Sequence, residues 1–144
     1  MKTLLSALLM IAFCFAASAQ KSKSYDTDAI SAGIDVVNIS WTDSGFTWDN
    51  DNPKGSFSID VVNTGTKTIT EVSWDFILVD KVRDHEYDHF KFKTGDKPIK
   101  PGQKKRLTKR IQFSTIPDYI SAQARIMRVK YDDGSEWARP EKGR

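Results

Sequence analysis

Apolar and polar residues alternate along the centre of the chain. Every second residue is apolar in a first run, residues 57–61, and again in a second, residues 72–78. Because successive side chains of a strand point to opposite faces, each run predicts a strand with one apolar face. Between them, Asn63 and Gly65 are residue types that favour a tight turn. The pattern therefore predicts a β-hairpin.

Similar runs recur on both sides of this predicted hairpin. They span residues 30–41, 86–93, 104–113 and 122–131. Asp133-Gly134 is a strong hairpin signal, with residues 136–138 as the return strand. No stretch keeps a helical period of 3.6 residues over two turns. We expect an all-β fold, an antiparallel immunoglobulin- or fibronectin-like β-sandwich of about seven strands, with Trp74 in its core.

Alternation also predicts which way individual side chains point in the strands 104–113 and 122–131. Met127, Val129 and Tyr131 alternate, which places them on one face of their strand. Lys109 falls on the apolar side of its own strand. A lysine in that position indicates either an edge strand or a side chain whose ammonium group extends past the apolar residues to water.

The first nineteen residues have the features of a secretory signal peptide. Lys2 precedes an apolar run over residues 4–17, and Ala17-Ser18-Ala19 resembles a cleavage site. The run is shorter than the roughly 20 residues that span a bilayer as a helix. We therefore expect a secreted or periplasmic protein. The expected organisation is a signal peptide (1–19), a flexible leader (20–29), a β-sandwich domain (30–139) and a charged tail (140–144).

Cleavage would remove Cys14, which is the single cysteine of the sequence. The mature protein would then have neither a disulfide nor a thiolate, and its stability would have to come from its core.

The net charge of +3 conceals an uneven distribution, because residues 91–110 carry nine Lys or Arg and one Asp. If neighbouring strands hold these cations, they form a positive face that attracts lipid head groups, anionic glycans or an acidic protein. The candidate residues are Lys93, Lys97, Lys100, Lys104, Arg106 and Arg110. A solvated face, with edge lysines that block aggregation, explains the same residues.

Three aromatic residues form a second candidate binding patch. Trp41, Phe46 and Trp48 lie in a segment rich in Ser, Thr, Asp, Asn and Gly. Exposed aromatic rings in such a setting can stack on sugars or anchor a protein partner. Alternatively, the same rings cap one end of the core.

The stretch His85-Glu86-Tyr87-Asp88-His89 matches the H-E-x-x-H signature of zinc proteases. That chemistry needs a helix, in which the two histidines share a face and bind one Zn²⁺. The alternating residues that follow predict a strand instead, in which the two imidazoles would lie roughly 13 Å apart. We expect a charged hairpin region, and keep a metal-dependent hydrolase as an alternative.

Other chemistry has little support in the sequence. Asp49-Asn50-Asp51-Asn52 has oxygen ligands at the spacing of a calcium loop, but Pro53 interrupts it and turn formation explains the residues equally well. Asp60 and Asp75 alternate with apolar residues and should face outward. We predict no enzyme activity, no cofactor and no metal site.

The run N-T-G-T-K-T-I…V-S-W-D-F-I-L-V-D, followed by P-I-K-P-G, resembles bacterial secreted immunoglobulin-like modules, among them the FxLYD-type domains. In such modules an Asn-small-Gly turn follows one strand, and a Pro-Gly turn precedes a later one. The match covers about Phe57 to Gly102, and departs from the name motif at its tyrosine, in the stretch 76–80. The resemblance implies a cell-envelope accessory module and supplies no catalytic residue.

The expected function is a secreted or periplasmic binding or accessory module without catalysis. Its partner would be a protein or a glycan of the cell envelope, not a nucleic acid, and the mature chain would not span the membrane. A structural envelope protein that associates with itself through an edge strand is a further alternative.

Overall fold

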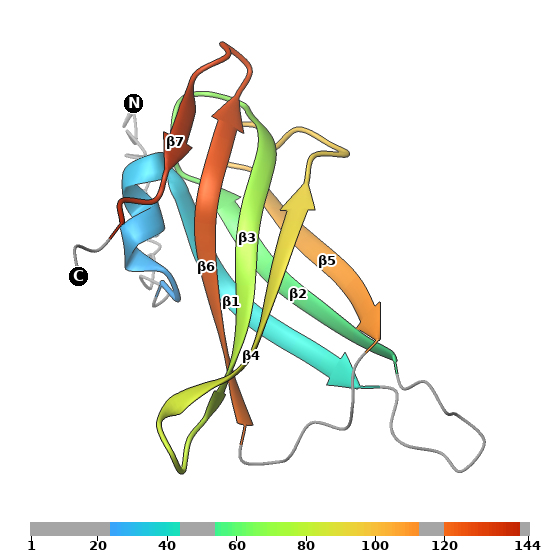
Figure 1. The fold of residues 1–144 in the computed structure, drawn as a ribbon. Helices are drawn as coiled ribbons and strands as arrows, with labels where there is room; N and C mark the ends of the chain where they lie inside the picture. The colour runs from blue at the N-terminus through green and yellow to red at the C-terminus, as the bar shows by residue number, and fades with distance from the viewer. Residues whose placement is uncertain (1–23, 44–53, 113–119, 142–144) are drawn as a thin grey trace, which may run out of the picture.

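The computed structural model describes residues 24–43, 54–112 and 120–141. These residues form one short 3-10 helix and seven strands (Figure 1). The elements are η1 (Thr27–Ala32), β1 (Ile34–Asp43), β2 (Lys54–Asn63), β3 (Ile69–Asp80), β4 (His85–Thr94), β5 (Lys104–Gln112), β6 (Ile120–Tyr131) and β7 (Glu136–Ala138). The strand pairs within the sheets are all antiparallel. The prediction of an all-β antiparallel fold is confirmed.

The strands form two sheets, of order β1-β2-β5 and β4-β3-β6-β7. The predicted central hairpin is therefore wrong, although both of its strands exist. β2 and β3 belong to different sheets, and the segment between them carries the chain from one sheet to the other. β2 and β3 each have one apolar face. Packing the two strands face to face, in opposite sheets, buries these apolar faces against each other, whereas pairing them edge to edge in a hairpin would not.

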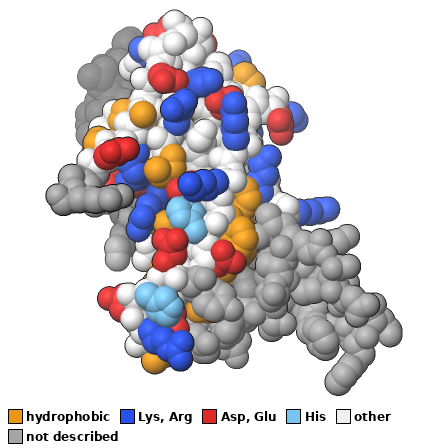
Figure 2. Space-filling view, viewed as in Figure 1, with side chains coloured by type: hydrophobic (Ala, Val, Ile, Leu, Met, Phe, Trp, Pro, Cys, Tyr) orange, Lys and Arg blue, Asp and Glu red, His pale blue; other side chains and the backbone are white. Residues whose placement is uncertain are grey.

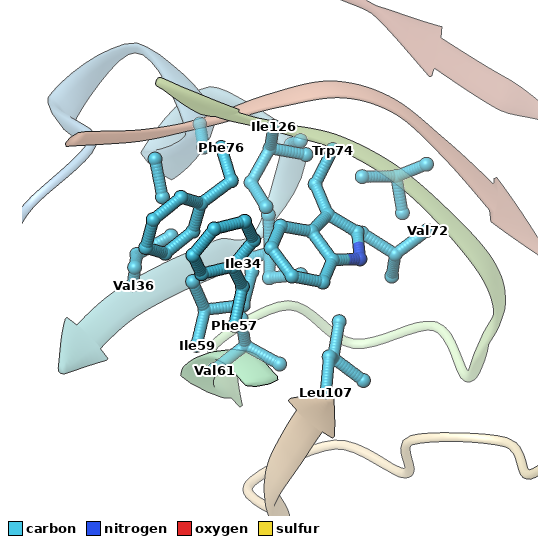
Figure 3. Close-up of a cluster of buried hydrophobic side chains, with 14 of the residues drawn as sticks. Ile34, Val36, Phe57, Ile59, Val61, Val72, Trp74, Phe76, Leu107 and Ile126 are labelled. Atoms are coloured by element: carbon cyan, nitrogen blue, oxygen red, sulfur yellow. The ribbon is translucent and has the colours of Figure 1, made fainter. Parts of the chain in front are cut away.

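The core lies between the sheets and is rich in aromatic rings (Figure 3). The rings of Phe57 on β2 and Phe76 on β3 stack with their centroids 4.3 Å apart. Trp74 is fully buried, as predicted, and its indole N–H donates to Thr94 Oγ1 at 3.1 Å. Burial of rings of this size supplies much of the hydrophobic stabilisation.

A bulge in β6 overturns the predicted face of this strand. Trp74 pairs with Ile126 but the preceding Ser73 pairs with Arg128, so Met127 is an extra residue. The alternation therefore changes phase: Ile126 and Val129 are fully buried, and Met127 is exposed. Met127 and Val129 do not share a face.

Of the two alternatives for Lys109, the edge strand is the arrangement found. β5 is the last strand of the three-stranded sheet, and Lys109 lies opposite Phe57 on the core-facing side. An inward-pointing charge at a sheet edge hinders the addition of another strand.

Part of the expected leader, residues 24–29, contacts the sheets through Asp26 and Ala29. Ala29 is fully buried and Asp26 is 6% exposed. The Asp26 carboxylate accepts from the backbone N–H of Ile126 at 2.6 Å and pairs with Arg139, whose Nε donates to the carbonyl of Ile126 at 2.8 Å. Two charged side chains thus form the backbone hydrogen bonds of Ile126 that a neighbouring strand would otherwise form.

Asn63 organises the passage from β2 to the other sheet. Its side chain is buried and donates to the carbonyls of Lys67 and Ile99, at 2.8 Å each, while its Oδ1 accepts from Gly65 N–H at 3.0 Å. Gly33 lies against Gly65, and a Cβ on Gly33 would come within 2.9 Å of the Gly65 Cα. With a φ of 68°, Gly33 also has a conformation that disfavours other residues.

Candidate binding surfaces

Within the described residues, the first half of β6 has an edge that no other strand covers. β7 pairs only with Arg128, Val129 and Lys130, and β3 occupies the other side of β6. The edge groups of Ile126 are taken by Asp26 and Arg139. Since backbone groups alternate in direction with period two, those of Ala122 and Ala124 point to the same side as those of Ile126. Within the described residues no strand pairs with that side.

A groove of about 460 Å³ runs beside this edge. Small or apolar side chains supply part of its lining, namely Ile39, Ala122 and Ala124. Charged groups line it as well, among them Arg125 and Arg139. Small side chains next to unpaired backbone groups allow another main chain to approach closely, which is the geometry needed for adding a strand.

The H-E-x-x-H stretch lies in β4 and not in a helix, as the alternation predicts. Both ring nitrogens of His89 contact carboxylates: Nε2 lies 2.7 Å from Asp75 Oδ2, and Nδ1 lies 3.1 Å from Glu86 Oε1. His85 is exposed, at the other end of the stretch. Among the described residues, no group of three or more His, Cys, Asp or Glu is arranged to hold a metal ion.

This geometry predicts that the two histidines contribute unequally to stability. His89→Ala should lower the free energy of unfolding by about 1 kcal/mol, because the buried Asp75 carboxylate loses a hydrogen-bond donor. His85→Ala, at an exposed position, serves as the matched control and should change it little. Urea unfolding checks both values. Tight zinc binding that either substitution abolishes would instead favour the hydrolase alternative.

The predicted positive face does not gather on one surface. Lys93 lies on β4 and pairs with Glu71, with Nζ and Oε2 2.8 Å apart. Lys104 and Arg106 lie on β5, in the other sheet, where both contact Asp60. Of the other predicted cations, Lys97 and Lys100 lie in the segment between these strands, and Arg110 lies on β5.

Asp60 and Asp75 behave in part as predicted. Both lie on outward sides of their sheets, since Asp60 is opposite Arg106 and Asp75 is opposite Lys91. Yet Asp60 is only 5% exposed and Asp75 6%, because the longer side chains of neighbouring strands cover them. Arg106 binds Asp60 through two nitrogens, with Nε–Oδ1 at 2.6 Å and Nη2–Oδ2 at 3.0 Å. These hydrogen bonds hold the pKa of Asp60 below its ordinary value.

The lowered pKa of Asp60 makes part of the stability pH-dependent. The unfolded chain has the ordinary aspartate pKa, about 4. The ion pair with Arg106 therefore stabilises the fold fully above about pH 4, and this stability is lost as the pH falls through the lower folded pKa. Arg106→Gln should reduce the urea midpoint at pH 7, and the difference from wild type should shrink below pH ~4.

Arg110→Gln is the control for this prediction, because Arg110 lies on the same strand and makes no ion pair within the described residues. A difference between wild type and Arg106→Gln that is as large at pH ~3 as at pH 7 would contradict the assignment.

The aromatic patch is described only in part. Trp41 lies on β1, is partly buried and packs against the core cluster. Phe46, Trp48 and the calcium-like stretch 49–52 lie outside the described residues. At Trp41, packing on the core is the arrangement found.

Sequence reasoning did not identify the free edge of β6. It depends on the length of β7 and on the bulge at Met127, and neither can be read from alternation alone. The small residues Ala122 and Ala124, at alternate positions in a strand otherwise rich in long side chains, were the available indication.

No family model and no curated protein matches this chain. Two solved structures are similar to it in part. Target SoR45 of the Northeast Structural Genomics Consortium has a TM-score of 0.46 and 11% identity, with 76% of this chain and 82% of that one covered. A protein given the name ApaA, from Bordetella pertussis, has a TM-score of 0.43 and 13% identity, with 69% and 83% covered. At TM-scores below 0.5, neither likeness carries an argument about function.

Proposed function

We propose that the protein is an exported, non-catalytic binding module that takes up an extended segment of a partner protein at the free edge of β6. The observation that carries this proposal is the groove beside Ala122 and Ala124, where β7 leaves the edge uncovered. An added strand would gain main-chain hydrogen bonds from the edge, and pockets for alternate side chains would select the sequence.

The strand order supports a fibronectin-like form of the sandwich, as the module type of this proposal. In the constant-type immunoglobulin domain the sheets have the order ABED and CFG, so the fourth strand (D) pairs with the fifth (E). Here the fourth strand, β4, pairs with the third, β3, and the sheets are β1-β2-β5 and β4-β3-β6-β7. The relation to FxLYD-type modules remains a prediction from the sequence.

Export is part of the proposal and rests on residues 1–19 alone. No helix within the described residues is long and apolar enough to cross a membrane. N-terminal sequencing of the protein produced in a bacterium that exports such precursors should find Gln20 as the first residue. A protein that keeps Met1 would contradict export by a cleaved signal peptide.

Ala124→Pro tests the binding edge. By the alternation of the strand, the N–H of Ala124 points away from β3, so proline removes a free donor and spares the ladder. Peptides selected from a phage-displayed random library on the wild type should bind the variant at least tenfold more weakly. Lys91→Pro is the matched control, because alternation likewise directs that N–H to the outer edge of β4.

Two outcomes would overturn the assignment of this edge. In one, Ala124→Pro keeps the thermal midpoint and also keeps the affinity for the selected peptides. In the other, Lys91→Pro loses the affinity to the same degree. A wild-type protein whose mass in solution doubles with concentration, and whose dimer Ala124→Pro abolishes, would favour self-association through the edge.

A further inference from the structure

The outer face of the four-stranded sheet carries cations from two strands that are far apart in the sequence. They are Lys91 and Lys93 on β4, and Arg125, Arg128 and Lys130 on β6. β3 runs between these strands, with Asp75 opposite Lys91 and Arg125, and Ser73 opposite Lys93 and Arg128. Figure 2 shows this face, where basic and acidic side chains are interspersed.

The acidic groups in the middle of this face are already engaged. Glu71 pairs with Lys93 at 2.8 Å and with Lys130 at 3.3 Å. The Asp75 side chain is 9% exposed and contacts His89. At the ends of the face, Glu86 contacts His89 and Glu136 lies opposite Lys130. An incoming anion therefore meets little uncompensated negative charge over the centre.

Three of the cations remain available. Lys91, Arg125 and Arg128 are exposed and make no ion pair within the described residues. Neighbouring strands lie about 4.8 Å apart, which places the cations of β4 and β6 roughly 10 Å from each other across β3. A small anion would contact the cations of only one of these strands, whereas a polymer with regularly spaced acidic groups would contact the cations of both β4 and β6.

We propose that this face binds an acidic polysaccharide, whose carboxylates contact Lys91, Arg125 and Arg128 as the chain crosses the strands. Among the described side chains here, Met127 is the one large apolar group that is exposed, at 37%. A face with so little apolar surface has no means of inserting into a membrane. It also lacks the row of exposed aromatic rings on which the bases of a single-stranded nucleic acid stack.

The test compares two sets of substitutions that remove the same charge. In one variant Lys91, Arg125 and Arg128 become glutamine; in the matched control Lys97, Lys100 and Arg110 do so. The probe is polygalacturonate, with dextran as the uncharged polysaccharide and calorimetry as the readout. The first variant should bind polygalacturonate at least tenfold more weakly than wild type, the control less than twofold, and affinity should fall steeply with salt.

Equal losses in the two variants would overturn the proposal, since net charge and not this face would then decide binding. Failure of the wild type to bind polygalacturonate would also overturn it. Parallel titrations with phosphatidylglycerol vesicles and with an oligonucleotide complete the design. Stronger binding to either one than to polygalacturonate would assign the face to a different class of partner and contradict the proposal.

Discussion

Replacing Arg139 with alanine is expected to lower the free energy of unfolding by about 3–5 kcal/mol, because it leaves the buried Asp26 carboxylate without a positively charged partner. Asp26 is 6% exposed, and the Arg139 side chain is 12% exposed. Arg139 also contacts Asp28 of η1 at 2.6 Å, so the substitution removes a second ion pair as well. Urea unfolding followed by tryptophan fluorescence measures the loss.

Arg128→Ala is the control for this result. Arg128 is an exposed residue of the same region, and it makes no ion pair within the described residues. Its substitution should change the unfolding free energy by less than ~0.5 kcal/mol. The double variant Asp26→Asn, Arg139→Met should be more stable than Arg139→Ala, because it buries no unpaired charge. Equal stability of the wild type and Arg139→Ala would refute the role of this pair.

Asn63→Asp is expected to have the second largest effect, a loss of about 3 kcal/mol or more at neutral pH. The amide donates to the carbonyls of Lys67 and Ile99, and a carboxylate cannot. The substitution would instead bury a negative charge against two carbonyl oxygens, in a residue that is 1% exposed.

The matched control is the same change from amide to carboxylate at Gln103, whose side-chain oxygen accepts a hydrogen bond. Gln103 is exposed, and its Oε1 accepts from Lys100 N–H at 3.0 Å, which a glutamate oxygen can also do. Gln103→Glu should therefore leave the urea midpoint nearly unchanged. A loss for Asn63→Asp no larger than that of Gln103→Glu would show that Asn63 does not join the two sheets.

Alternation was enough to predict most strands, the position of Lys109 on the apolar side of its strand and the burial of Trp74. These depend on one strand and one apolar face at a time. The pairing of β2 with β3 was predicted wrongly, because turn residues at Asn63 and Gly65 suit both a hairpin and a crossing between sheets. The deciding contacts, such as the bond from Asn63 to Ile99, join distant residues.

The candidate sites depend even more than the fold does on contacts between residues that are far apart in the sequence. Asp26 and Arg139 are 113 residues apart, so nothing local marks them as partners. Contiguity in the sequence was misleading for the cations, because residues 91–110 cross from one sheet to the other. The cations that share a face come instead from β4 and β6, which both pair with β3.

The most direct test of the proposed function is amide hydrogen exchange with and without a peptide selected on the wild type. Strand addition predicts that the amides of Ala122 and Ala124 exchange freely in the unbound protein and become protected when the peptide is present. Amides on the outer edge of β4, such as that of Lys91, should not change. Protection confined to β4 or β5, with Ala122 and Ala124 unaffected, would contradict binding at the edge of β6.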